Sequence, residues 1–113
     1  MSMNETEFVR LSENIFDYID EYVGEHFDEF DTTKNGNVLT IEHEDGAQII
    51  VNRHTANQEL WIAAKSGGYH FHFENGDWVA TRDGSEFFSV LSEAIGSLVD
   101  EKVNIPAYTE WIS

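Results

Sequence analysis

Carboxylate side chains crowd the first quarter of the chain. Ten of the 22 Asp and Glu residues lie between positions 5 and 31, and Arg10 is the only basic residue among them. Like charges three or four positions apart on a helix each cost about 0.2–0.5 kcal/mol, so this arrangement does not favour folding. Carboxylate oxygens are hard ligands suited to iron, manganese or calcium. They also attract basic patches on proteins.

The spacing places part of this acidic run on one helix face. At 100° per residue, Glu13, Asp17, Asp20 and Glu21 lie opposite an apolar stripe, and further carboxylates continue the run to Asp31. No calcium loop or paired Glu-x-x-His motif accompanies them, which predicts weak, multiple and salt-sensitive metal sites. The alternative is an ordinary solvated helix face, although general surface acidity would spread its charge more evenly.

A second group of polar and aromatic residues falls on predicted strands. In the segment 59–64, Leu60 and Ile62 alternate with Trp61, which places Trp61 on the opposite strand face. An exposed tryptophan is a frequent interaction anchor, but a Trp61 that lies flat and fills a gap between neighbours is an equal alternative. His70 and His72 also share one strand face, where ordinary exposed histidines are a more frequent outcome than a metal site.

Composition excludes several function classes. The chain has 113 residues, no cysteine and a formal net charge of −16, so disulfides and thiolate chemistry are absent and nucleic acid or anionic membranes are poor partners. No apolar run has the length of a transmembrane helix, and the acidic N-terminus is unlike a targeting peptide. No catalytic motif occurs. We therefore expect a cytoplasmic protein that is not an enzyme and has no organic cofactor.

Hydrophobic periodicity gives the elements that position these residues. A helical period covers 4–24, with Asn4 or Thr6 as its cap, and returns over about 85–99, with Ser85 as its cap. Between them, strands are expected at 28–33, 38–42, 48–53, 60–64, 69–73 and 78–81, and Asn35-Gly36 indicates a type I′ hairpin. The prediction is a single α+β domain, 1–113, with two helices on one face of a five- to six-stranded antiparallel sheet. A tail with Tyr108 and Trp111 follows from about residue 100.

These segments resemble the frataxins, specifically the short bacterial CyaY-type members, over nearly the whole chain. Asp83-Gly84 followed by Phe87, Phe88 and Leu91 fits the family pattern. The most specific matches are Asn37-Val38-Leu39-Thr40-Ile41-Glu42, Ile50-Val51-Asn52-Arg53, Leu60-Trp61-Ile62-Ala63 and Gly67-Gly68-Tyr69-His70-Phe71.

The resemblance implies a helix–sheet–helix sandwich that binds iron weakly and regulates iron–sulfur cluster assembly by docking on the cysteine desulfurase. The cluster scaffold protein is a further partner that it suggests, with a monomer at low iron. By position, the metal ligands form what we call the acidic ridge: Asp17, Asp20, Glu21, Glu25, Asp28, Glu29 and Asp31. The implied partner contacts are Asp20, Glu21, Glu25, Asn52, His54 and Trp61.

The sequence departs from the family pattern on one predicted strand face. His54, Ala56 and Glu59 stand where the family has Gln, Pro and Gln, and strand parity puts His54 and Glu59 beside Asn52 and Trp61. An accessory metal contact by His54 is one interpretation of this change. The alternative function is an iron storage or ferroxidase protein that forms iron-loaded oligomers, although a ferroxidase requires a preorganised dinuclear site that the sequence does not show.

Overall fold

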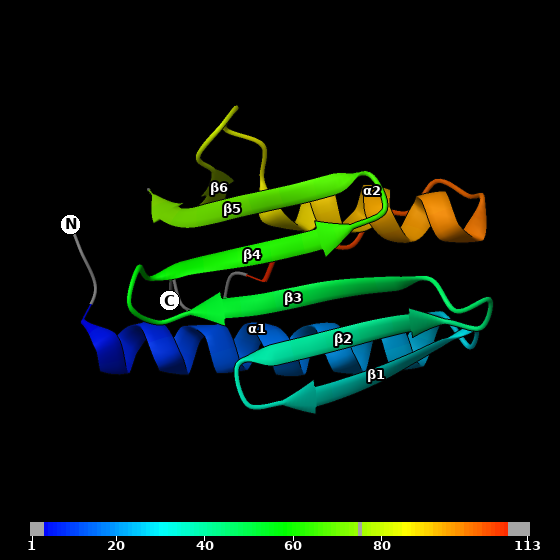
Figure 1. Cartoon of the computed structure of the whole chain (residues 1–113), viewed down its shortest axis with the longest axis horizontal. Coiled ribbons are helices and arrows are strands. Elements are labelled where there is room, and N and C mark those ends of the chain that lie inside the picture. Colours follow the sequence, from blue (N-terminus) through cyan, green and yellow to red (C-terminus); the bar gives the residue numbers. More distant parts are fainter. Residues whose placement is uncertain (1–3, 75, 109–113) are drawn as a thin grey trace.

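The computed structural model describes residues 4–74 and 76–108. One helix, six strands and a second helix follow one another along the chain, and the strands pair in sequence order as one antiparallel sheet (Figure 1). The elements are α1 (Glu5–His26), β1 (Phe30–Asn35), β2 (Val38–His43), β3 (Gln48–His54), β4 (Glu59–Ala64), β5 (Gly67–Glu74), β6 (Asp77–Ala80) and α2 (Phe87–Val99).

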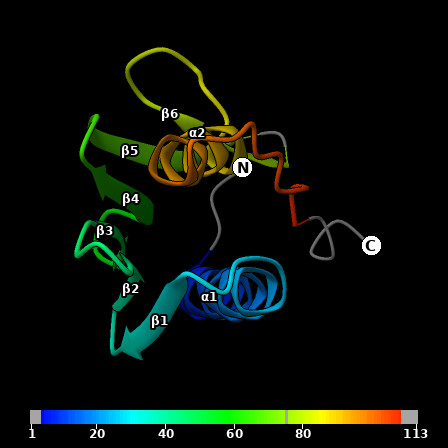
Figure 2. The same cartoon turned by 90° about the vertical axis from the view of Figure 1, so that its right-hand side faces the viewer.

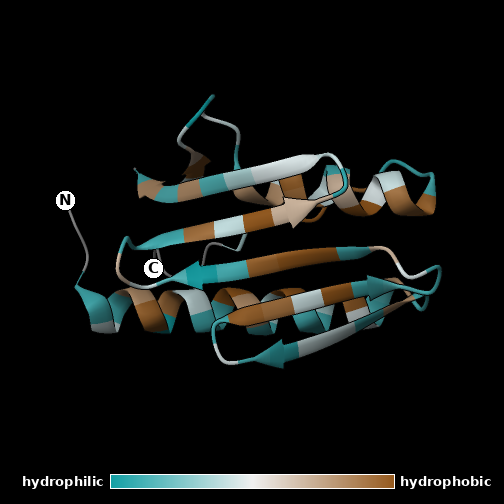
Figure 3. Cartoon of the chain, in the orientation of Figure 1, coloured by the Kyte–Doolittle hydropathy of each residue, from teal (hydrophilic) through white to brown (hydrophobic). Residues whose placement is uncertain are grey.

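Both helices cover the same face of the sheet, as Figure 2 shows edge-on, and the predicted two-layer α+β sandwich is confirmed with six strands. Buried residues alternate with less buried ones along β2 to β4, and each of these strands carries hydrophobic residues (Figure 3). Leu39, Val51 and Ile62 point to the helices and are buried. Their neighbours in sequence therefore lie on the other side, which we call the open face. No helix in the described ranges is long and apolar enough to cross a membrane.

Helix α1 begins at a capping box. The Asn4 side chain accepts from the Glu7 backbone N–H at 2.8 Å, and Glu7 accepts from the Asn4 N–H at 3.1 Å, so two end groups are satisfied reciprocally. Of the two caps that the sequence left open, the structure has Asn4. The buried stripe includes Phe8, Ile15 and Ile19, and the helix runs two residues beyond the predicted end.

Two local predictions were wrong by one residue. The first hairpin turns on Gly36-Asn37, and only Gly36 has a positive φ, of 63°. A type I′ turn requires positive φ at both central residues, so this turn follows the type II′ pattern. The second error concerns α2, which is capped by Glu86: its carboxylate accepts from the Phe88 N–H at 2.8 Å. The backbone carbonyl of Ser85 instead accepts from the Ala80 N–H.

A buried arginine holds α1 to the first hairpin. Arg53 on β3 is 8% exposed and points to the helix layer. It pairs with Glu13 Oε1 at 2.7 Å and donates to Ser12 Oγ at 3.1 Å. On its other side it donates to the Gly36 carbonyl at 3.2 Å and to Asn37 Oδ1 at 3.2 Å. One guanidinium thus joins three elements, and this fixes how the acidic face of α1 sits beside β1.

The tail returns across the helix layer. The Ile105 N–H donates to Ser92 Oγ of α2 at 2.9 Å, and the Tyr18 hydroxyl of α1 donates to the Pro106 carbonyl at 2.6 Å. Tyr108 packs on Tyr18 with ring centroids 5.4 Å apart. Of the two tail aromatics that the sequence left unplaced, Tyr108 folds back on the helices, whereas Trp111 lies outside the described residues.

Two helical glycines give a matched stability prediction. At Gly96 an added Cβ would lie 2.6 Å from the Glu101 carbonyl oxygen, whereas at Gly24 it would meet nothing within 4 Å. We expect Gly96→Ala to lower the free energy of unfolding by about 1–3 kcal/mol through the clash. Gly24→Ala should raise it by about 0.5–1 kcal/mol, because alanine loses less backbone entropy in a helix. Urea unfolding of both variants measures this, and equal effects would contradict the tail contact.

Candidate functional site

The acidic ridge follows the solvent side of α1, continues through the connection and ends on β1. Six of its seven residues are exposed, and Glu29 is half-buried. Asp28 and Glu29 lie in the connection rather than in a strand, because β1 begins at Phe30. The connection stays close to the sheet, since the Glu29 carbonyl accepts from the Glu44 N–H at 2.9 Å. The seven carboxylates therefore lie along two adjacent elements and their link.

The β1 side of this surface is engaged internally. Lys34 of β1 forms an ion pair with Glu13 and lies 3.7 Å from Asp17, and the Thr32 hydroxyl donates to Asp20. The bond from Lys34 holds the pKa of Glu13 below its ordinary value, against an opposing contribution from burial. In return, the Glu13 carboxylate raises the pKa of Lys34. Glu13 is thus a structural residue, although it belongs to the same helix face as the ridge.

The rest of the ridge has a different status. Glu21, Glu25, Asp28, Glu29 and Asp31 form no ion pair among the residues that the structure describes. Within the same ranges, no three His, Cys, Asp or Glu side chains surround a common position for a metal ion. A ridge of separate carboxylates can bind hard cations one or two oxygens at a time, and it can meet a basic protein surface as a whole.

The open face carries a stack of three rings. The indole of Trp61 on β4 lies between the imidazoles of His54 on β3 and His70 on β5. The ring centroids are 4.1 and 3.9 Å apart and the planes differ by 3° and 7°. The sequence prediction that Trp61 occupies this face is confirmed. Its ring also fills the space between neighbouring side chains, as the alternative interpretation expected.

Polar contacts frame that stack. The Trp61 Nε1–H donates to Glu59 Oε1 at 3.0 Å, and His72 Nε2 lies 2.8 Å from Glu74 Oε2. The register pairs Asn52 with Trp61, so Asn52, His54 and Glu59 share the open face as strand parity predicted. The His54–Trp61–His70 stack was missed, because it depends on cross-strand register, and the only sequence signal was one ring at matching parity on each of three consecutive strands.

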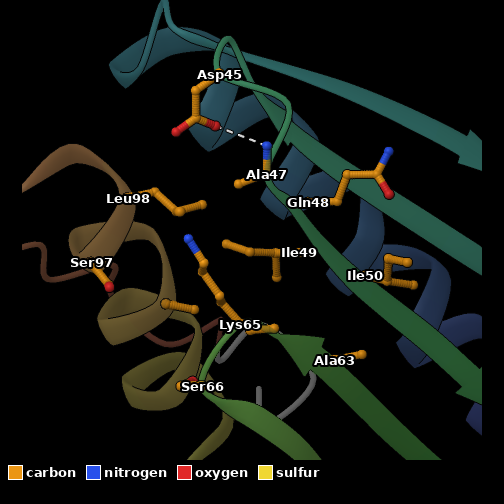
Figure 4. Close-up of a pocket in the computed structure, with 12 residues that line it drawn as sticks. Asp45, Ala47, Gln48, Ile49, Ile50, Ala63, Lys65, Ser66, Ser97 and Leu98 are labelled. Carbon is orange, nitrogen blue, oxygen red and sulfur yellow. Dashed lines mark hydrogen bonds between the residues drawn. The ribbon is translucent and has the colours of Figure 1, made fainter.

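A cavity of about 550 Å³ also lies between the sheet and the C-terminal half of α2 (Figure 4). Ile49, Ala94 and Leu98 contribute apolar walls, and the Lys65 side chain extends over them (Figure 4). At its rim Asp45 accepts from the Ala47 N–H at 2.8 Å. Sequence patterns did not indicate it, because its residues come from three separate segments. It brings together no general acid, base or nucleophile pair, so it does not support a catalytic site.

Comparisons with known proteins agree with this geometry. A family model described as a frataxin-like domain matches residues 1–101. The chain is 59% identical over 103 residues to the iron–sulfur cluster assembly protein CyaY of Neisseria meningitidis serogroup B, covering 91% of this chain and 96% of that one. Frataxin from Psychromonas ingrahamii gives a TM-score of 0.84 at 33% identity, over 93% of this chain and all of that one. Trimeric yeast frataxin complexed with ferrous iron gives a TM-score of 0.68 at 23% identity, over 89% of this chain and 90% of that one. This is a likeness of fold alone.

The paired carboxylate gives a pH-dependent prediction. We expect Glu13→Gln to lower the free energy of unfolding at pH 7 by about 1 kcal/mol, because Arg53 and Lys34 lose their charged partner. Since folding lowers the pKa of Glu13, its contribution is present above the ordinary value of 4.5 and is lost as the pH falls through the folded-state pKa. Denaturant unfolding from pH 7 to pH 3 should show the two proteins converging at the acid end.

The matched control is Glu25→Gln on the same helix. Glu25 has Glu21 one turn before it on α1 and Asp28 three residues after it, in the connection. It has no basic partner in the described ranges. Its neutralisation should raise the free energy of unfolding by about 0.2–0.5 kcal/mol at low ionic strength and much less in high salt. A loss of stability for Glu25→Gln would mean that the ridge is held by internal pairs.

Proposed function

Because the chain belongs to the family of frataxin-like domains, we propose that it acts in iron–sulfur cluster assembly as a regulator that binds iron and the cysteine desulfurase. Relatives at 59% and 57% identity carry the name of an iron–sulfur cluster assembly protein. This supports the general role. The finer proposal rests on the surface of this chain, and above all on the exposed carboxylates between Glu21 and Asp31 that have no basic partner among the described residues.

The ridge is proposed to work through electrostatics rather than catalysis. A chain with a net charge of −16 repels other acidic surfaces and attracts a basic one, and a continuous acidic strip orients that encounter. Because its carboxylates already repel one another, a basic partner relieves a cost that the isolated domain carries. Asp20 and Glu21 are adjacent on α1 and Glu25 lies about one turn further on, which lets one partner surface reach all three.

Iron is the proposed cargo of the same surface. Ferrous and ferric ions accept carboxylate oxygen ligands, and separate exposed carboxylates bind such ions weakly. Iron on the ridge and a basic protein surface on the ridge neutralise the same charges. Desulfurase docking therefore becomes responsive to the iron concentration, which is how a domain without catalytic residues is able to regulate an enzyme.

The open face is the proposed second contact. Asn52, His54 and Trp61 lie together there, and the Trp61 ring is held in one orientation by the imidazoles on both sides. A preorganised aromatic side chain loses little conformational freedom on binding, which is why tryptophan anchors are effective. We assign this face to the desulfurase or to the scaffold that receives the cluster.

A charge-reversal experiment tests the docking proposal. The triple variant Asp20→Lys, Glu21→Lys and Glu25→Lys should bind purified cysteine desulfurase at least tenfold more weakly, because attraction becomes repulsion. Isothermal titration calorimetry at about 0.1 M salt, where exposed charges still interact over about 10 Å, measures the affinity. Circular dichroism checks that the variant is folded.

The matched control carries the same change of charge elsewhere. Asp77, Glu93 and Glu101 are exposed and lie outside the ridge, so Asp77→Lys, Glu93→Lys and Glu101→Lys together alter net charge equally. This control should bind the desulfurase nearly as well as the unmodified chain. If both triple variants weaken binding to the same degree, total charge rather than the ridge governs the interaction, and the proposal is wrong.

The iron proposal needs a separate measurement. In a titration of the ¹⁵N-labelled chain with Fe²⁺ under anaerobic conditions, amide signals of residues 17–31 should broaden first, because bound paramagnetic iron relaxes nearby nuclei. The desulfurase, added to the diamagnetic protein, should perturb an overlapping set. Iron effects centred on His70 and His72 instead would move the metal site to the open face and remove the iron-dependent competition.

A further inference from the structure

A cavity of about 340 Å³ opens on the outer side of α1, where the tail crosses the helix. Three of its lining residues are tyrosines, Tyr18 and Tyr22 from α1 and Tyr108 from the tail, and we call it the tyrosine cavity. The Tyr18 ring lies 6.0 Å from the Tyr22 ring and 5.4 Å from the Tyr108 ring, centroid to centroid. The three rings therefore form one continuous aromatic wall.

The lining of the cavity is also anionic. Asp17, Glu21 and Glu25 line it, and their spacing of four residues places them in one row along α1. Glu21 and Glu25 have no ion pair within the described ranges, and the pairing of Asp17 with Lys34 is long at 3.7 Å. A single hollow thus offers aromatic rings and carboxylates in one lining.

A hydrogen bond and a ring contact hold the aromatic wall in position. The Tyr18 hydroxyl donates to the Pro106 carbonyl at 2.6 Å, which fastens the tail so that Tyr108 reaches the cavity. Burial, and then the neighbouring Tyr22, raises the pKa of Tyr18 above its ordinary value of 10.0. Tyr18 also packs edge-on against Phe88 of α2, with centroids 5.7 Å apart. The ring that joins the other two is therefore fixed by two further contacts, with Pro106 and with Phe88.

We propose that the tyrosine cavity receives the side chain of one arginine from the protein that docks on the acidic ridge. A guanidinium group is planar and weakly hydrated, so it stacks on an aromatic face while it donates two parallel hydrogen bonds to a carboxylate. Glu21 is the natural acceptor, because it lies between the other two carboxylates of the row. The proposal rests on ridge docking as its premise and adds an anchor at a defined point.

The lining also discriminates against other cations. A hydrated iron ion uses the carboxylate oxygens and gains little from aromatic faces, whereas an ammonium group stacks less well than a guanidinium and binds only as a point charge. Tyr108 lies beyond residues 1–101, which match the family model. The third ring is thus a feature of the tail.

A titration with small probes tests the cavity without any partner protein. The ¹⁵N-labelled full chain is titrated with blocked Gly-Arg-Gly, and in parallel with Gly-Lys-Gly and Gly-citrulline-Gly. We expect saturable shifts at the lining residues, strongest for arginine, weaker for lysine and absent for citrulline, which has the shape of arginine without its charge. Shifts that do not saturate, or equal affinities for the arginine and lysine peptides, would overturn the proposal.

Variants separate the aromatic wall from the charge. Tyr22→Leu and Tyr108→Leu keep every carboxylate, and each should weaken the arginine peptide about two- to fivefold, as expected for loss of one exposed cation–π contact. Tyr108→Phe, which keeps the ring, is the matched control and should bind normally. If only Glu21→Gln weakens the peptide and the leucine variants do not, the cavity is plain negative surface and the proposal is wrong.

The same variants tell this proposal apart from the proposed function. If the leucine variants lose neither peptide nor desulfurase affinity, the ridge still docks but the cavity is not its anchor. If the chain binds the arginine peptide as predicted yet does not bind the desulfurase, the cavity stands and the assigned partner is wrong. Thermal unfolding of each variant accompanies the titrations, and a folded Tyr22→Leu protein alone is sufficient for the comparison.

Discussion

The geometry of this molecule depends on one buried guanidinium. Arg53 lies inside the sandwich, 5.4 Å from the centre of the Phe16 ring, and a buried charge is tolerated only when it is paired and hydrogen-bonded. Glu13 supplies the opposite charge and the first hairpin supplies carbonyl and amide oxygens. Since these partners belong to different elements, the requirement to satisfy one residue fixes the rotation of α1 about its axis and its distance from β1.

Both candidate surfaces follow from that constraint. With Glu13 turned toward Arg53 and Lys34, the carboxylates of the ridge are left on the outer side of α1, where the described residues offer little cationic charge to oppose them. In β3, an inward Arg53 places Asn52 and His54 outward by strand alternation. The open face and the ridge are therefore two consequences of the same packing, and they approach each other at Asp31, which alternates with the buried Phe30 on β1.

The fold was predictable because its signals are local, whereas the sites were predictable only as regions. The period of the apolar residues identified both helices and all six strands, and Asn4 was one of the two caps expected at the start of α1. The turn at Gly36 and the cap of α2 were misplaced by one residue, because tertiary packing chooses among neighbouring polar residues. The ring stack and the tyrosine cavity depend on register and on the path of the tail, which no local pattern encodes.

A surface without a preorganised cage suits a regulator better than a storage protein. Tight iron binding would require ligands held around one position, and no such group of side chains occurs among the described residues. Under the proposed function, the separate carboxylates of the ridge would hold ions weakly, so that bound iron would follow its free concentration. A protein partner, in contrast, gains from fixed anchors, and the rings of Trp61, Tyr18 and Tyr22 are the rigid parts of these surfaces. The division is physical: carboxylates on flexible side chains give reversible, salt-dependent attraction, and immobilised aromatic rings give the orientation that charge alone lacks.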